Sequence, residues 1–168
     1  IISRHGGEIR VESRPGVGST FTIVLPAAQI TPPVEESQTA AHVGRPGRIL
    51  LIDDEAELCR IIQRALEAQN HRVAAFSSPE QALATFLAAP HAFDLIITDL
   101  GMPNISGWDL AATIRAANAG VPIIIITGWG DRLDSALMQQ YHISAVLAKP
   151  FDIEDLTRLV GQTVGRKA

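Results

Sequence analysis

Residues 48–55 read RILLIDDE and residues 93–100 read FDLIITDL, and these two stretches indicate the fold. Each holds a short apolar run with the length of a buried strand, followed by acid. Asp53 and Asp54 follow the first run, and Asp99 follows the apolar part of the second. Apolar strands that end in carboxylates are typical of parallel sheets that bind ligands at their carboxyl ends.

The same pattern recurs along residues 48–168, where five apolar runs alternate with amphipathic segments. The runs begin near Ile49, Val73, Leu95, Ile123 and Ala145. Residues that can cap a helix precede three of the amphipathic segments, and they are Ser78, Ser106 and Asp152. This alternation predicts an α/β fold in which helices cover a parallel sheet.

The three strand-end acids are expected to converge, because the carboxyl ends of parallel strands lie at one edge of the sheet. Carboxylates that lie a few ångströms apart repel one another, and each raises the pKa of its neighbours. A hard cation that prefers oxygen ligands relieves this repulsion, and Mg²⁺ suits such a cluster. The sequence therefore predicts a magnesium site that includes Asp53, Asp54 and Asp99.

Two further polar residues end the fourth and fifth apolar runs. Thr127 follows IIII, and Lys149 lies before Pro150 in AVLAKP. A cation, a hydroxyl and an ammonium around Asp99 could together hold the oxygens of a phosphoryl group. This set of groups favours phosphoryl transfer onto a carboxylate, in which the protein positions the reactants and neutralises charge.

With these motifs in order and in register, residues 48–165 resemble the receiver domain of two-component response regulators. The resemblance rests on DD, DLGMPNISGWDL, the Thr of ITGWG and KP. It implies a flavodoxin-like, doubly wound sheet of five parallel strands in the order 2-1-3-4-5. It also implies that Asp99 accepts the phosphoryl group from a phosphohistidine.

The resemblance assigns roles to the other site residues as well. It implies that Asp54 ligates Mg²⁺ directly, that Asp53 does so mainly through water, and that the Gly101 carbonyl is a further ligand. Thr127 would bind a phosphoryl oxygen, and Lys149 would pair with the phosphoryl group. Three residues before this lysine, many receivers carry a switch Tyr or Phe, whereas this chain has Val146. The usual coupling between the threonine and that aromatic residue therefore lacks its aromatic partner in this chain.

The first residues read IISRHGGEIRVESRPGVGSTFTIVLP without an initiator Met, so we expect that sequence upstream is missing. Two alternating stretches, EIRVES and STFTIVL, predict a β-hairpin with a glycine-rich connection. The segment resembles the end of a histidine-kinase ATPase domain, in which Gly16 and Gly18 would belong to the second glycine-rich box of the ATP lid. The same two glycines would also suit an ordinary turn.

The expected organisation is an ATPase remnant over 1–26, a flexible linker over 27–47 and the receiver over 48–168. The linker is rich in Pro, Ala, Gly, Glu, Ser and Gln, so it has little apolar surface to bury. Together these parts suggest a piece of a hybrid sensor histidine kinase. The piece itself is expected to accept phosphate without kinase activity, and the longer parent to be a histidine kinase.

Composition limits the other possibilities. The net charge of −4 resides in residues 48–168, which argues against a nucleic-acid partner. The lone Cys59 excludes an internal disulfide, which fits a reducing cytoplasm. The longest apolar run, VPIIIITGW, is too short to cross a bilayer, so no membrane contact is expected.

Two other functions remain open from the residues alone. A haloacid-dehalogenase-type phosphatase also uses a strand-end aspartate and Mg²⁺, but it requires DxDx[TV] where this chain has DDEAE. The receiver of a DNA-binding response regulator should be followed by an effector domain. The expected partners are a histidine kinase, foremost the chain's own kinase core, and a histidine phosphotransfer protein. The apolar face of the hairpin also suggests a dimer formed through residues 1–26.

Overall fold

The computed structural model describes residues 7–16, 18–26, 45–128 and 134–164. The chain divides into two compact units, the first at the N-terminal end and the second comprising the rest. The predicted linker lies outside the described residues except for positions 45–47.

The larger unit is built on a five-stranded parallel sheet. The strands are β3 (Arg48–Ile52), β4 (Arg72–Phe76), β5 (Leu95–Asp99), β6 (Ile123–Thr127) and β7 (Ala145–Ala148). Their order in the sheet is β4-β3-β5-β6-β7. When these strands are renumbered from β3, the order becomes 2-1-3-4-5, so the predicted doubly wound topology is confirmed.

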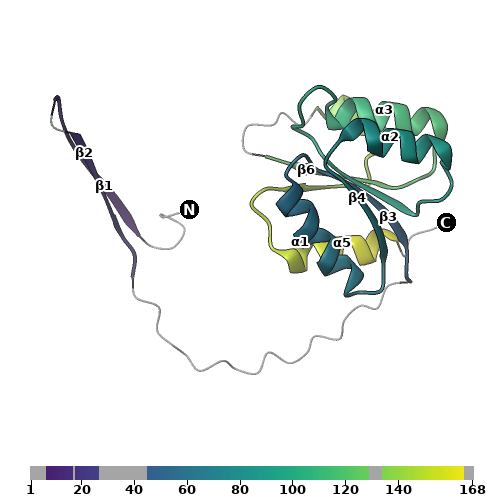
Figure 1. The fold of residues 1–168 in the computed structure, drawn as a ribbon, viewed down its shortest axis with the longest axis horizontal. Helices are drawn as coiled ribbons and strands as arrows, with labels where there is room; N and C mark the ends of the chain where they lie inside the picture. The colour runs from purple at the N-terminus through teal and green to yellow at the C-terminus, as the bar shows by residue number, and fades with distance from the viewer. Residues whose placement is uncertain (1–6, 17, 27–44, 129–133, 165–168) are drawn as a thin grey trace. The chain divides into compact units, whose positions relative to one another are not determined.

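Helices cover both faces of this sheet, with α1 and α5 on one face and α2 and α3 on the other (Figure 1). The helices are α1 (Ala56–Glu67), α2 (Pro79–Ala88), α3 (Gly107–Ala117), α4 (Ser135–Gln140) and α5 (Ile153–Val164). Two predicted caps are confirmed. The Ser78 hydroxyl accepts the Gln81 N–H, and Ser106 forms a reciprocal capping box with Asp109.

The two faces bury separate apolar clusters because side chains alternate along each strand. Leu50, Ile52 and Ile96 pack toward α2 and α3, around Phe86 and Leu110. Their neighbours on the same strands pack toward α1 and α5, and include Ile49, Leu51, Leu95, Ile97, Ile62 and Val160. The central strands β5 and β6 are buried throughout, so the sheet rigidly supports the groups at its ends.

The last residue of the expected linker already belongs to the packed unit. Gly47 is buried, and its N–H donates a hydrogen bond to Nδ1 of His71 over 3.2 Å. A side chain at Gly47 would come within 2.8 Å of Val164. Burial lowers the pKa of His71, which favours the neutral ring that this hydrogen bond requires.

The smaller unit is a hairpin of β1 (Glu8–Arg14) and β2 (Gly18–Val24), as predicted. Antiparallel pairing places Ile9 opposite Ile23 and Val11 opposite Phe21, so these four side chains share one face. All four are exposed, each with more than half of its surface accessible. Gly16 and Gly18 have φ angles of +76° and +128°, which L side chains rarely adopt. Gly16 therefore suits the turn after β1, and Gly18 the start of β2.

Among the described residues, no helix is long and apolar enough to cross a membrane.

Candidate functional site

The sheet brings the predicted site residues to the carboxyl ends of its strands. The register pairs Asp99 of β5 with Ile126 of β6, and Thr127 with Ala148 of β7. Asp53 follows the last residue of β3, and Lys149 follows the last residue of β7. Groups from four strands therefore meet at one edge, as expected for an open α/β sheet.

Lys149 is the centre of this group. Its Nζ lies 2.7 Å from Oδ1 of Asp99 and 3.0 Å from Oδ2 of Asp53. Burial disfavours the charged ammonium, but the hydrogen bonds and negative charges of Asp99 and Asp53 outweigh this and raise the pKa of Lys149. Lys149 is therefore a fixed positive charge beside two carboxylates.

Asp53 is fully buried and held from two sides. Its Oδ1 accepts the Glu55 N–H over 2.9 Å, while Oδ2 accepts from Lys149. Burial nevertheless raises the pKa of Asp53, and the two hydrogen bonds offset this only in part. The carboxylate therefore carries a desolvation cost that a further cation would relieve.

Asp99 is almost fully buried, and backbone groups hold its position. Its Oδ2 accepts the Gly101 N–H over 2.8 Å, and its carbonyl accepts the Thr98 hydroxyl over 3.0 Å. The next residue is fixed as well, because the Leu100 N–H donates to the Ile126 carbonyl of β6. One carboxylate oxygen thus faces the ammonium and the other faces the loop.

The start of α3 lies unusually close to this loop. The Gly107 N–H donates to the Leu100 carbonyl over 3.0 Å. A Cβ atom at Gly107 would lie 2.6 Å from the Asp99 carbonyl oxygen and 3.0 Å from Cα of Leu100. Gly107 therefore allows the helix to pack directly onto the backbone that carries Asp99.

Three of the other predicted residues, Thr127, Asp54 and Gly101, lie at the same edge of the sheet. Thr127 is buried, and its carbonyl accepts the Lys149 N–H over 2.6 Å. Asp54 and Gly101 are exposed beside Asp53 and Asp99. Val146 is half-buried in β7, where it pairs with Ile125 and packs on the α2–α3 side of the sheet.

Sequence reasoning missed two contacts of the site. Glu55 reaches the ammonium of Lys149, with Oε1 3.2 Å from Nζ. In the sequence, only the acid that follows Asp53 and Asp54, which is Glu55 itself, could have indicated this contact. Cys59 was expected to act as a small apolar residue, and it is buried, but its thiol also donates to the Asp53 carbonyl over 3.3 Å. Burial is the main cause that raises the pKa of Cys59 to about 11, so the thiol stays protonated.

The oxygen donors at this edge suit Mg²⁺ chemically, since three carboxylates and a backbone carbonyl lie on two adjacent loops. Among the described residues, no three His, Cys, Asp or Glu side chains are already gathered as a metal site. The ammonium of Lys149 instead joins Asp53 to Asp99. The unrelieved burial of Asp53 is the feature that fits a divalent cation.

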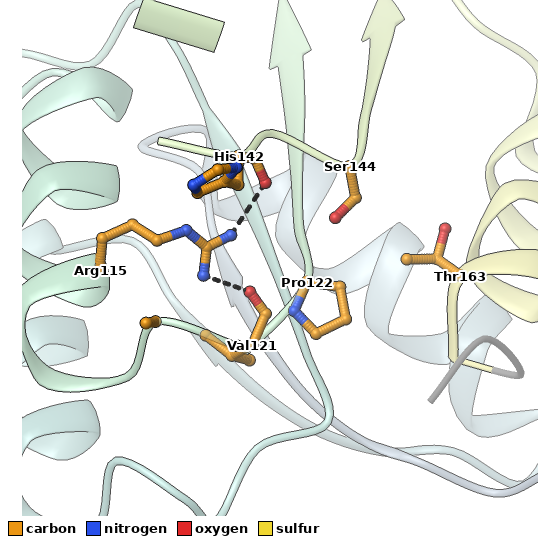
Figure 2. A pocket seen from close by; sticks show the side chains of 8 residues that line it. Arg115, Val121, Pro122, His142, Ser144 and Thr163 are labelled. Atoms are coloured by element: carbon orange, nitrogen blue, oxygen red, sulfur yellow. Dashed lines mark hydrogen bonds between the residues drawn. The ribbon is translucent and has the colours of Figure 1, made fainter. Parts of the chain in front are cut away.

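A pocket of about 380 Å³ lies at the opposite edge of the sheet, away from these acids. It is bordered by the residues before β6 and β7 and by the end of α5, including Pro122, Ser144 and Thr163 (Figure 2). On one side of it, the guanidinium of Arg115 donates to the carbonyls of Val121 and His142. Apart from Arg115 on α3, the residues that line the pocket lie before β6 and β7 or at the end of α5, so the pocket is separate from the acid cluster.

The fold and the acid–lysine cluster define a doubly wound α/β domain with a polar site at its strand ends. The family model of the response regulator receiver domain matches residues 49–161. The chain therefore belongs to the response regulator receiver domain family and is a receiver of two-component signalling. The resemblance inferred from the strand-end motifs is confirmed.

Individual relatives agree with this assignment. The virulence sensor protein BvgS of Bordetella bronchiseptica is 32% identical over 182 residues, which cover all of this chain and 14% of that protein. The response regulator ArlR of Staphylococcus saprophyticus is 38% identical over 109 residues, which cover 65% of this chain and 48% of that protein. The chain thus spans less than half of either relative.

Solved structures show the same fold. A response regulator receiver domain protein from Clostridium thermocellum superposes with a TM-score of 0.67 at 32% identity. The match covers 71% of this chain and 95% of that structure.

Proposed function

We propose that Asp99 of this receiver accepts a phosphoryl group from the phosphohistidine of a kinase, with Mg²⁺ as cofactor. The observation that carries the proposal is the shared ammonium, which contacts both buried carboxylates at the strand ends. An ion cluster placed there neutralises charge at the edge where doubly wound sheets bind their ligands.

In the proposed step, a carboxylate oxygen of Asp99 attacks the phosphorus atom. The bond from phosphorus to the imidazole nitrogen breaks, and its electron pair returns to the ring. The ring leaves as neutral histidine, since its other nitrogen keeps a proton. The products are an aspartyl phosphate and the free histidine of the kinase.

The surrounding residues would hold the transferred group. Asp53, Asp54, Asp99 and the Gly101 carbonyl would bind Mg²⁺, which supplies charge neutralisation for the phosphoryl oxygens. Lys149 is already 2.7 Å from Asp99 and would pair with the phosphoryl group as it arrives. Thr127, buried at the same edge, would donate its hydroxyl to a phosphoryl oxygen. Val146 occupies the switch position.

We also propose that the chain is part of a hybrid sensor histidine kinase, and that its hairpin is the end of the ATPase domain. The alignment with the Bordetella virulence sensor protein supports this because it extends over the whole chain, hairpin included. Gly16 and Gly18 would then be remnants of the ATP lid. The phosphodonor would be the kinase core of the same protein, and a histidine phosphotransfer protein would be a second partner.

Phosphorylation with acetyl phosphate tests the site. In the presence of Mg²⁺ we expect intact-mass spectrometry to show one added phosphoryl group, and Asp99→Asn to remove it. Chelation of Mg²⁺ should also prevent the modification, because the carboxylates and the donor are all anionic.

Asp155→Asn is the matched control, since this exposed carboxylate pairs with Arg158 on α5 and does not belong to the site. It should be phosphorylated like the parent chain. A phosphoryl group that survives Asp99→Asn would refute the assignment of the acceptor.

A further inference from the structure

Glu55 adds a third carboxylate to the ammonium of Lys149. Its Oε1 lies 3.2 Å from Nζ, the longest of the three contacts. The Glu55 side chain is 66% exposed, whereas those of Asp53 and Asp99 are 0% and 7% exposed. Glu55 therefore contacts the ammonium from the solvent side, where a phosphodonor has to enter.

The negative charges around Lys149 make the position of the Glu55 carboxylate important for phosphorylation of Asp99. Three carboxylates share one ammonium, and Asp54 adds another acid next to Asp53. The two buried acids are required for the proposed chemistry, but Glu55 has neither burial nor a place among the proposed metal ligands. Its charge does, however, repel an arriving phosphoryl group and compete with that group for Lys149.

We propose that Glu55 is a positioning residue that restrains phosphorylation of this receiver by holding the Lys149 ammonium toward solvent in the unmodified state. When a phosphoryl group reaches Asp99, the exposed contact to Glu55 gives way, and the ammonium turns wholly to Asp99 and its phosphate. The residue thus sets how readily anionic donors modify the site. This inference rests on the proposed function of Asp99.

The local backbone supports a role for the side chain beyond folding. The part of Glu55 that serves the fold is its main chain, because its N–H binds Asp53 and its carbonyl accepts the Cys59 N–H. The residue precedes α1 without a side-chain capping bond. Substitution of the side chain therefore leaves those backbone bonds available.

Glu55→Gln keeps a hydrogen-bond acceptor near Lys149 and removes only the charge. With acetyl phosphate at saturating Mg²⁺, we expect the rate constant for modification of Asp99 to rise about threefold to fivefold at low ionic strength. The increase should shrink at about 0.5 M salt, because screening then weakens the repulsion. The same variant should bind beryllofluoride more tightly by a similar factor.

Glu57→Gln is the matched control. Glu57 lies two residues further along the chain, is 82% exposed and pairs with Arg60 instead of Lys149. It carries the same charge change without the contact, so its rate should stay within about 1.5-fold of the parent rate.

Glu55→Asp separates charge from contact, since it retains the charge on a shorter side chain. It should raise the rate less than Glu55→Gln does. If the parent chain is modified at Asp99 but Glu55→Gln reacts no faster than Glu57→Gln, the inference about Glu55 is wrong. If the parent chain is not modified at all, the proposed function itself fails.

Discussion

At the residue scale, the site depends on how closely backbone approaches the Asp99 carboxylate. One carboxylate oxygen is held by the Gly101 N–H and the other by Lys149. The loop that supplies the Gly101 N–H packs closely on the start of α3 at Gly107. Small displacements of this helix would therefore move the group that is proposed to react.

Gly107→Ala tests this packing. The added methyl group would meet backbone atoms at 2.6 and 3.0 Å, which cannot rotate away as a side chain can. We expect the free energy of unfolding to fall by about 1–3 kcal/mol and phosphorylation of Asp99 to slow.

The free energies of unfolding of Gly107→Ala and of the control variant Gly120→Ala can be compared by denaturant unfolding. At Gly120 the nearest atom would be 3.9 Å from the new Cβ, so that substitution should change stability by less than about 0.5 kcal/mol. Equal stabilities for the two variants would show that the close approach at Gly107 is not a constraint.

At the element scale, Arg115 near the end of α3 joins segments that are distant in sequence. Its guanidinium donates to the carbonyl of Tyr141, after α4, over 2.6 Å. It also donates to the carbonyls of His142, at 3.0 Å, and of Val121 before β6, at 2.5 Å (Figure 2). Burial lowers the pKa of Arg115, and these carbonyls take the place of the lost water.

Arg115→Met should cost about 2–4 kcal/mol of unfolding free energy, because several partly buried carbonyls lose their donors together. Arg158→Met provides the comparison, since Arg158 makes an exposed pair with Asp155 and should matter by less than about 1 kcal/mol. Thermal or denaturant unfolding of both variants distinguishes them. Similar losses would mean that the Arg115 bonds add no stability.

The strands and two helix caps could be predicted from sequence, because apolar runs and capping residues act locally. Ser78 and Ser106 illustrate this, since each binds an N–H three residues away. The strand order was expected only from the resemblance to receiver domains. The bonds of Arg115 to the Tyr141 and His142 carbonyls and the contact of Glu55 with Lys149 could not be predicted. They join residues 26 to 94 positions apart and depend on how loops pack once the sheet has formed.

At the scale of the whole molecule, the hairpin carries a face of exposed apolar side chains. On its other face, β1 carries charges of alternating sign at Glu8, Arg10, Glu12 and Arg14. If two copies of β1 pair antiparallel about Val11, every acid of one strand lies opposite a base of the other. Opposite charges in directly facing positions stabilise such a pair, and an unpaired strand edge invites it.

We therefore expect the 168-residue chain to form dimers through its hairpin. Light scattering should report a dimer for this chain and a monomer for a chain that begins at Arg48. The sheet formed by two hairpins would have four strands, more than the marginal two-stranded case. If both chains are monomeric at the same concentration, the hairpin does not self-associate.

The central claim is that Asp99 becomes phosphorylated, and chemical trapping of the acyl phosphate tests it most directly. Borohydride reduces an aspartyl phosphate to homoserine, so peptide sequencing by mass spectrometry after phosphorylation identifies the acceptor. We predict homoserine at position 99 after treatment with acetyl phosphate and Mg²⁺, and unmodified aspartate at positions 53 and 54. Homoserine at either of those positions, with Asp99 unchanged, would contradict the account.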